Sequence, residues 1–165
     1  MKRILLLCGV VVAALTAAEA LNPAPVFIWN QTASIERGLY IQTNSNVETS
    51  VTVAVSPPPN FRNLLQERRY LPSTVPLMKR VVAADGDQIC RIGDEIILNQ
   101  EQIARAKEKD SAGRILPEWQ GCFVLSAHEV FLLGSHENSL DGRYFGPVRR
   151  ESIIGTYRLI WRVGG

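Results

Sequence analysis

The sequence predicts a mainly β domain that follows one N-terminal apolar helix. Short apolar runs of strand length recur along the chain, and Gly, Pro and Asn separate them, which is the pattern of strands joined by turns. Helical periodicity extends over few residues beyond the apolar segment at the start of the chain. With 165 residues, the chain has room for one domain with a sizeable core.

The chain begins with an export segment. Lys2 and Arg3 precede an apolar run, residues 4–21, in which Glu19 is the only charge. This run is just long enough to cross a bilayer, and the preceding positive charges would stay in the cytoplasm. The stretch Ala18-Glu19-Ala20 has small residues at the positions that a signal peptide cleavage site requires. A membrane anchor and a cleaved signal peptide are therefore both compatible with the sequence.

Both interpretations divide the chain at the same point. Residues 1–21 are expected to be a signal anchor or signal peptide, and residues 22–165 an exported domain. Cys8 lies too early in the chain for a convincing lipidation site, and Leu7 before it is too large a residue for one.

Three elements are expected in the first half of the exported domain. Residues 22–30 contain two prolines and form an extended segment that leads into a polar loop with Ser34. Residues 51–55 alternate like a strand, and three prolines end it. Residues 61–70 have apolar side chains at helical spacing, which predicts a short amphipathic helix or lid. A serine in a polar loop is more often solvated or capping than nucleophilic.

Lys79 lies inside an apolar run, residues 75–82, that predicts a strand ending at the turn of Asp85 and Gly86. It can be an edge-strand charge whose stem covers apolar surface while its ammonium reaches water. Alternatively, the strand removes water from the amine and lowers its pKa from about 10.4 by about 3 units, roughly 4 kcal/mol, so that it can act as a base. A nucleophile and an orienting partner elsewhere would decide between these interpretations.

The second half of the chain continues the pattern of short strands. Asn99 and Gln100 can turn a hairpin, and residues 105–113 predict an exposed, charged excursion. Residues 134–148 are dense in small and polar side chains between two apolar runs, which indicates a loop with a specific function. The strands expected here are residues 95–98, 102–104, 123–125, 130–133 and 153–161.

Cysteine usage agrees with export. Apart from Cys8, the chain has only Cys90 and Cys122, both in the exported part. An oxidising compartment favours pairing, so we predict a disulfide between them, with two buried free thiols as the alternative.

Composition argues against several other classes of function. The chain has 18 basic and 16 acidic side chains and no basic block, so nothing indicates a nucleic-acid partner. A Ser-His-Asp site can be imagined from Ser139, His136 and Asp141, but these residues crowd one loop and leave Lys79 unexplained. The two histidines, His128 and His136, and the cysteine pair show no metal-ligand spacing, and no cofactor is expected.

Four motifs occur in the chain in a fixed order. They are Asn30-x-Thr32-x-Ser34 followed by Gly38-Leu39-Tyr40; Leu77-x-Lys79-x-Val81-x-Ala83-x-x-Gly86-Asp87; Leu116-Pro117-x-Trp119-x-Gly121-Cys122; and Asn138-Ser139-x-Asp141-x-Arg143-Tyr144-Phe145-Gly146-Pro147. Together with the apolar N-terminal segment, they resemble the type I signal peptidase clan, and within it the conjugative-transfer peptidases of the TraF type. The last motif is the most specific, and the resemblance covers nearly the whole chain.

The resemblance implies a signal-peptidase-like β domain with a Ser/Lys dyad. Ser34 would be the nucleophile and Lys79 its general base, with no histidine required. The chemistry agrees, because a hydroxyl is a poor nucleophile at neutral pH and a desolvated amine can take its proton.

Supporting roles follow from the same resemblance. The oxyanion would be held by the Ser34 backbone N–H and the Thr32 hydroxyl. Ser139 matches the residue that orients the lysine, and Asp141 and Arg143 would pair to hold their loop. The chain departs from the family at Glu36, where proline is usual. Since proline fixes φ and would stiffen the loop, this change concerns the substrate-side geometry more than the chemistry.

The resemblance also implies a setting. TraF-type relatives mature the pilin subunit of a conjugative secretion system, and some join its new carboxyl end to its own amino terminus. The expected protein is a bacterial inner-membrane endopeptidase with its catalytic domain in the periplasm, and a prepilin as substrate. The alternatives are a general signal peptidase acting on many leader-peptide-bearing proteins and a noncatalytic module of an envelope assembly.

Overall fold

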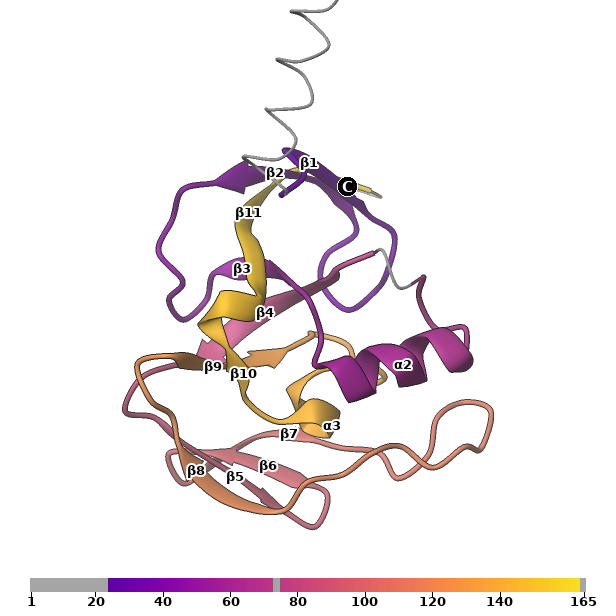
Figure 1. The fold of residues 1–165 in the computed structure, drawn as a ribbon, viewed down its shortest axis with the longest axis vertical. Helices are drawn as coiled ribbons and strands as arrows, with labels where there is room; N and C mark the ends of the chain where they lie inside the picture. Colours follow the sequence, from indigo (N-terminus) through magenta and orange to yellow (C-terminus); the bar gives the residue numbers. More distant parts are fainter. Residues whose placement is uncertain (1–23, 73–74, 164–165) are drawn as a thin grey trace, which may run out of the picture.

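The computed structural model describes residues 24–72 and 75–163, and within these ranges the strands form two antiparallel sheets (Figure 1). The larger sheet has seven strands in the order β1-β2-β11-β3-β4-β9-β10, and the smaller has four in the order β7-β6-β5-β8. The mainly β prediction is therefore confirmed.

The strands are β1 (Phe27–Asn30), β2 (Gly38–Thr43), β3 (Thr52–Val55), β4 (Leu77–Ala83), β5 (Gln88–Ile92), β6 (Glu95–Leu98), β7 (Glu101–Arg105), β8 (Gly121–Val124), β9 (Glu129–Leu133), β10 (Val148–Arg149) and β11 (Ile153–Arg162). The helices of the described part are α2 (Pro59–Glu67), α3 (Gly142–Phe145) and the 3-10 turn η1 (Arg150–Ser152).

Most of the expected strands are present within a residue or two, including β3, β4, the β6–β7 hairpin, β8, β9 and β11. The hairpin turns at Asn99 and Gln100, which both have positive φ. Three strands were not predicted, β2, β5 and the two-residue β10, whereas β1 lies in the segment that was expected to be extended. The excursion at residues 105–113 is mostly exposed, as expected, but Ala106 within it is buried in the core.

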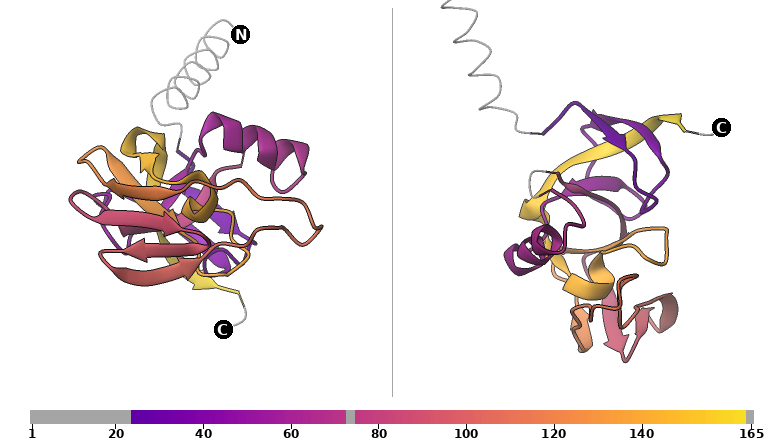
Figure 2. Two further views of the ribbon diagram at one scale, coloured as in Figure 1. Left: turned by 90° about the horizontal axis from the view of Figure 1, so that it is seen from below. Right: turned by 90° about the vertical axis from the view of Figure 1, so that its right-hand side faces the viewer.

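The long strand β11 curls the larger sheet. It pairs with β2 through its second half and with β3 through its first half, and each pairing contains a register shift. Such irregularities bend a strand and increase its twist. Figure 2 shows β11 (yellow) running from the middle of the molecule, beside β3, to the β1–β2 end near the C-terminus. The curl brings the loop after β1 over β4, where the Ile35 and Tyr40 side chains pack against Met78.

The two faces of strand β4 pack against two different core clusters. Leu77 and Val81 belong to the cluster under α2 and α3, whereas Met78 faces the cluster under the β1–β2 loop. Successive side chains of a strand point to opposite faces, so Lys79 shares the inward face with Leu77 and Val81. Its burial therefore follows from its register on the strand.

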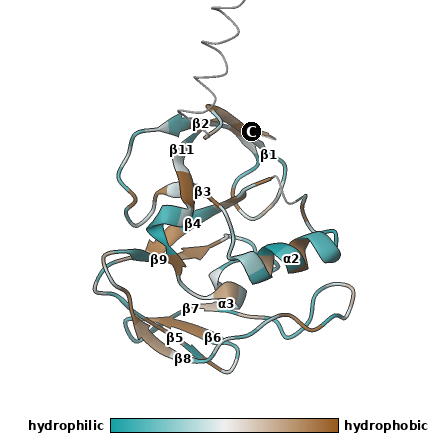
Figure 3. Cartoon of the chain, viewed as in Figure 1, coloured by the Kyte–Doolittle hydropathy of each residue, from teal (hydrophilic) through white to brown (hydrophobic). Residues whose placement is uncertain are grey.

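Helix α2 was predicted over residues 61–70 and is observed over Pro59–Glu67. Pro59 occupies the first helical turn, where its missing N–H costs nothing. Phe61 and Leu65 are buried in the core, whereas most of the helix is hydrophilic (Figure 3). The element is an amphipathic helix, as the apolar spacing indicated.

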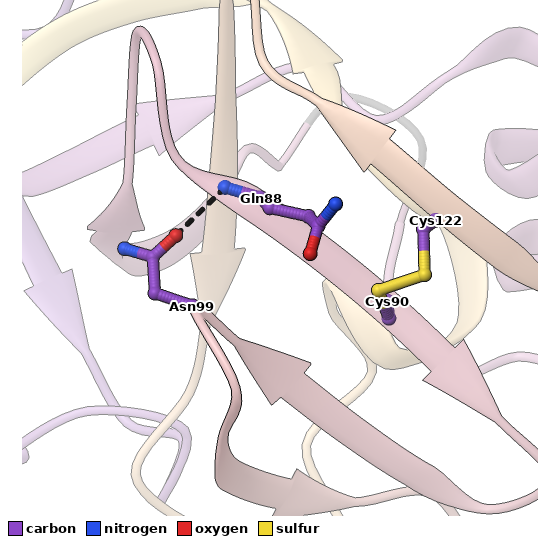
Figure 4. The surroundings of a disulfide bond; sticks show 4 residues. All are labelled: Gln88, Cys90, Asn99 and Cys122. Carbon is purple, nitrogen blue, oxygen red and sulfur yellow. Dashed lines mark hydrogen bonds between the residues drawn. A yellow bond between two sulfur atoms is a disulfide. The ribbon is translucent and has the colours of Figure 1, made fainter.

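The smaller sheet contains the disulfide. Cys90 on β5 and Cys122 on β8 are directly opposite in the strand register, and their sulfur atoms are bonded (Figure 4). The predicted disulfide is therefore confirmed. The bond closes a loop with a sequence separation of 32 residues, and it joins an edge strand to its neighbour away from the cavity described below.

The predicted export segment, residues 1–21, and Cys8 lie outside the described residues. In the part of the chain that the structure does describe, none of the helices has the length and apolarity that a bilayer crossing requires.

Candidate active site

A cavity of about 640 Å³ opens between the loop after β1, the start of β4 and the loop after β9. Its lining is mainly apolar. Ser34, Lys79 and Ser139 all reach it, although they lie far apart in the sequence. The structure thus brings together the nucleophile, the base and the orienting residue that the motifs nominate. Concave, mostly apolar cavities with a few convergent polar groups are the usual form of a ligand site.

Ser34 lies in the loop between β1 and β2, which Ile35 anchors by inserting its side chain into the core. The Ser34 hydroxyl lies 2.8 Å from the Thr32 hydroxyl and 3.5 Å from the Met78 carbonyl oxygen. The Tyr40 hydroxyl donates to the Glu36 carbonyl at 2.8 Å, which ties the far end of the loop to β2. These contacts hold the loop of Ser34 against β2 and β4.

Asn30 was not predicted as a site residue, yet its carboxamide is the centre of this loop. It donates to the carbonyl oxygens of Thr32, Ile35 and Glu36 at 3.0, 3.3 and 3.0 Å. Its oxygen accepts from the Thr32 backbone N–H at 3.2 Å and from the Thr32 hydroxyl at 2.8 Å. The motif places Asn30 two residues before Thr32, but the spacing alone does not predict the hydrogen bonds that Asn30 forms.

Lys79 is only 3% exposed and pairs with Val53 in the β3–β4 register. Burial lowers the pKa of its ammonium group from 10.5 to about 8; Asp141 opposes this shift and Arg143 adds to it. Across residues 24–72 and 75–163, no hydrogen bond or salt bridge of Nζ is formed, and none joins it to Ser34 Oγ. The structure therefore has a desolvated amine, as the second interpretation of Lys79 requires.

The loop after β9 approaches Ser34 very closely. The Ser135 backbone N–H donates to the Ser34 carbonyl oxygen at 2.6 Å. A Cβ atom at Gly134 would lie 1.9 Å from Ser139 Oγ and 2.8 Å from the Ser34 carbonyl oxygen. Glycine is therefore the residue that fits at position 134, a requirement that no local sequence signal indicated.

Ser139 points into this crowded region. It is 5% exposed, and its Oγ has no hydrogen-bond partner in the described part of the chain. A buried hydroxyl without a partner costs free energy, so its retention calls for a reason. Ser139 and Lys79 line the same cavity.

Asp141 and Arg143 form a buried ion pair at 3.2 Å. Asp141 also accepts from the backbone N–H groups of Gly134 and Arg143 at 2.8 and 3.1 Å. The Arg143 guanidinium donates to the carbonyl oxygens of Gly134, His136 and Glu137. Burial raises the pKa of Asp141, and Arg143 and the backbone donors act against that shift. The pair holds the shape of the loop from residue 134 to 143.

The alternative triad is not assembled. His136 Nδ1 accepts from the Asn138 backbone N–H at 3.1 Å, whereas Asp141 bonds to Gly134 and Arg143. Within the described residues no hydrogen bond joins the side chains of Ser139, His136 and Asp141.

Glu36, which replaces the usual proline, has partners of its own. Its carboxylate lies 3.6 Å from the Arg80 guanidinium and 3.7 Å from that of Arg162. These exposed pairs join the loop between β1 and β2 to β4 and β11, although pairs of this kind contribute little stability.

Comparisons with known proteins identify relatives of this chain. Residues 1–162 match the family model described as "Signal peptidase, peptidase S26". An Escherichia coli protein named "Plasmid transfer protein TraF" is 34% identical over 145 residues, which cover 80% of this chain and 82% of that protein. A second one from the same species is 35% identical over 140 residues, covering 78% and 79%.

Two further similarities are more distant. "Conjugal transfer protein TraF" of Agrobacterium fabrum is 31% identical over 124 residues, covering 70% of this chain and 69% of that protein. The crystal structure of a signal peptidase I from Enterococcus faecalis is 16% identical with a TM-score of 0.41, covering 69% of this chain and 98% of that one. The match of the family model over nearly the whole sequence shows that the chain belongs to the signal peptidase S26 family.

Proposed function

We propose that this protein is a serine endopeptidase with Ser34 as nucleophile and Lys79 as general base. The observation that carries the proposal is the burial of Lys79 in the cavity that Ser34 lines. With a pKa of about 8 instead of 10.5, about 9% of the amine is neutral at pH 7, compared with about 0.03% of an ordinary lysine. Burial therefore raises the fraction able to accept a proton about 300-fold.

In the reaction we propose, these groups act in turn. Ser34 Oγ attacks the peptide carbonyl carbon, and Lys79 takes the hydroxyl proton. The oxyanion is held by the Ser34 backbone N–H and the Thr32 hydroxyl. When the peptide C–N bond breaks, Lys79 gives its proton to the leaving amine, and an acyl-enzyme remains. A water molecule, activated by the neutral amine, then releases the new carboxyl end.

Two open strand edges support binding of an extended peptide. Strand β4 pairs with β9 only from Arg80 onward, so within the described residues Leu77, Met78 and Lys79 have a sheet neighbour on the β3 side alone. Strand β1 is the edge of its sheet. Residues 28–30 and 75–79 line the same cavity. A substrate laid between them can form strand-type backbone hydrogen bonds and bring its carbonyl to Ser34.

The supporting residues have separate jobs in this proposal. Ser139 orients the Lys79 amine, since both reach the cavity and Ser139 Oγ has no partner among the described residues. Asp141 and Arg143 hold the loop that carries Ser139. The apolar lining suits small apolar side chains next to the bond that is cut.

The setting we propose is conjugative transfer. The relatives named for plasmid and conjugal transfer support it, and the apolar segment at residues 1–21 supports an inner-membrane anchor with the catalytic domain in the periplasm. The substrate is a prepilin tethered at the membrane. Capture of the acyl-enzyme by the amino terminus of the substrate, in place of water, would cyclise the pilin.

The test is the intact mass of a candidate pilin co-expressed in membranes with wild type, Ser34→Ala, Lys79→Ala or the matched control Lys109→Ala, which replaces an exposed lysine. We expect wild type and the control to shorten the pilin and the other two variants to leave it at full length. A product lighter by one further water marks cyclisation. If Lys79→Ala processes at the wild-type rate, Lys79 is not the base; if Ser34→Ala does so, Ser34 is not the nucleophile and the proposed mechanism is wrong.

A general signal peptidase is the second candidate, and the family description favours it. It predicts many exported substrates with small residues before the cut, whereas the first candidate predicts one. Comparing the membrane and exported proteins of cells with wild type and Ser34→Ala separates the two. Accumulation of many uncleaved precursors would support the general enzyme.

A further inference from the structure

Asn30 ends strand β1 and is 5% exposed, so its carboxamide is buried beside the nucleophile loop. Its five hydrogen bonds all go to residues 32–36, the segment that contains Ser34. It bonds to the backbone on both sides of the nucleophile and to the side chain of Thr32.

The orientation of this carboxamide is determined by its neighbours. The nitrogen faces three carbonyl oxygens, which can only accept, and the oxygen faces the Thr32 backbone N–H, which can only donate. Turning the amide over would place like groups against each other at every one of these contacts. The oxygen of Asn30 is therefore the atom that faces the Thr32 hydroxyl.

This orientation fixes two hydroxyl hydrogens in turn. Asn30 Oδ1 has no hydrogen, so the 2.8 Å bond to Thr32 Oγ1 uses the hydrogen of Thr32. A hydroxyl has one hydrogen, so Thr32 can only accept in its 2.8 Å bond with Ser34. Ser34 has one hydrogen and two acceptors within reach, Thr32 Oγ1 at 2.8 Å and the Met78 carbonyl oxygen at 3.5 Å. Since Thr32 cannot donate to Ser34, the shorter contact requires the Ser34 hydrogen, which therefore points toward Thr32. The resting enzyme holds it away from Lys79, with which Ser34 forms no hydrogen bond in the described residues.

We propose that Asn30 is a positioning residue for the nucleophile, acting through Thr32 to order the Ser34 hydroxyl and through the loop carbonyls to fix its place. The inference rests on the proposed function. In the resting state Ser34 Oγ–H donates to Thr32, which accepts from Ser34 and donates to Asn30. During attack the Ser34 hydrogen passes to Lys79, and Thr32 must turn its own hydrogen from Asn30 to the oxyanion. After each turnover, Asn30 accepts the hydrogen bond of the Thr32 hydroxyl again.

The direction of the hydrogen bonds from Ser34 to Thr32 to Asn30 leads to specific predictions. Asn30 is buried and acts through another residue, so its loss should lower kcat and leave KM nearly unchanged. Removing the Thr32 hydroxyl breaks the same chain, so the two losses should not add. Thr32→Ser keeps the hydroxyl, and Thr32→Val removes it at nearly constant shape.

The experiment measures kcat, KM and Tm of the full chain on the candidate pilin. The variants are Asn30→Ala, Thr32→Val, the double variant of these two, Thr32→Ser, Ser34→Ala as the inactive reference, and Asn99→Ala as the matched control. Asn99 also bonds to the backbone, accepting from the Gln88 N–H at 2.9 Å, but it does so in a hairpin of the smaller sheet (Figure 4). Its loss lowers stability without touching the cavity.

We expect Asn30→Ala to lower kcat about 100-fold, as a nucleophile displaced by about 1 Å does, with KM within about threefold. Asn99→Ala should lower Tm and keep kcat, and Thr32→Ser should stay within about threefold of wild type. The kcat of the double variant should fall by a much smaller factor than the product of the two single-variant factors. If Asn30→Ala does not fold, Asn30→Ser takes its place.

Three outcomes would overturn the inference. One is an unchanged kcat in the Asn30 variant, and another is an equal loss of kcat in Asn99→Ala, which would make the effect one of stability. Fully multiplicative losses in the double variant would show that Asn30 does not act through Thr32. Each of these leaves the proposed function intact if Ser34→Ala is inactive. If wild type is no faster than Ser34→Ala, the proposed function and the inference fall together.

Discussion

Replacing Lys79 by methionine should destroy activity and stabilise the fold. Burial lowers the pKa of Lys79 from 10.5 to about 8, which corresponds to about 3 kcal/mol of destabilisation of the protonated folded chain, since each pKa unit is about 1.4 kcal/mol. Methionine fills a similar apolar volume and has no charge to desolvate. At pH 7, Lys79→Met should therefore be more stable than wild type by up to about 3 kcal/mol, or about 6–12 °C in Tm for a chain of this size.

The pH dependence of this difference has a definite sign. Below pH 8 the amine is protonated in both the folded and the unfolded chain, so the full penalty applies. Between pH 8 and 10.5 the folded chain releases the proton while the unfolded chain keeps it, so wild type gains stability as the pH rises. Above pH 10.5 both are neutral, and the advantage of Lys79→Met should disappear.

The assay is urea unfolding of the full chain in detergent at pH 7 and at pH 9.5, followed by circular dichroism. Lys109→Met is the matched control, since Lys109 is exposed, and it should change stability by less than about 0.5 kcal/mol. A Lys79→Met variant that is less stable than wild type at pH 7 would refute the reasoning, because the ammonium would then not be desolvated. A difference that does not shrink at pH 9.5 would refute it equally.

Three more predictions follow from the same structure. The kcat/KM of wild type should rise with pH and level off above about 8, the pKa of Lys79; a pH–rate profile that still rises toward 10.5 would contradict the base assignment. Gly134→Ala should lower kcat and cost about 1–3 kcal/mol in denaturant unfolding, because the new Cβ would lie 1.9 Å from Ser139 Oγ; wild-type activity would show that the loop can move. Replacing Cys90 and Cys122 by serine should cost about 3–4 kcal/mol in urea unfolding for a loop of this length and leave kcat unchanged, since the bond lies outside the cavity; a loss under about 1 kcal/mol would contradict this account.

The strands that could be predicted are those whose apolar residues are uninterrupted or alternate. β4 was predicted from its apolar run, and the run also placed Lys79 inside it. β5 was missed because Arg91, which is typical of a surface, is 4% exposed and points inward. Its guanidinium donates to the carbonyl oxygens of Gly93 and Arg143 at 3.0 and 2.8 Å. A buried charged residue whose guanidinium is satisfied by backbone carbonyl groups interrupts the apolar pattern by which a strand is predicted.

The same limit applies to the site. Motif resemblance nominates Ser34 and Lys79 and the residues around them, because each motif is local. The role of Gly134 depends on the approach of its loop to the Ser34 carbonyl, a hundred positions away in the sequence. The function proposed for Asn30 depends on the direction of each hydrogen bond. Contacts between distant segments and hydrogen-bond directions are properties of the folded chain, which composition and spacing do not contain.

The ion pair of Asp141 and Arg143 explains how a lysine near a carboxylate can remain a base. Asp141 alone would favour the Lys79 ammonium, since an opposite charge nearby raises the pKa of a lysine. Both Asp141 oxygens, however, face Arg143 and the backbone of Gly134, and the positive charge of Arg143 acts on Lys79 in the opposite direction. The two charges oppose each other at Lys79, so desolvation decides its protonation state. The interaction that gives the loop its shape therefore also keeps the neutral amine accessible near neutral pH.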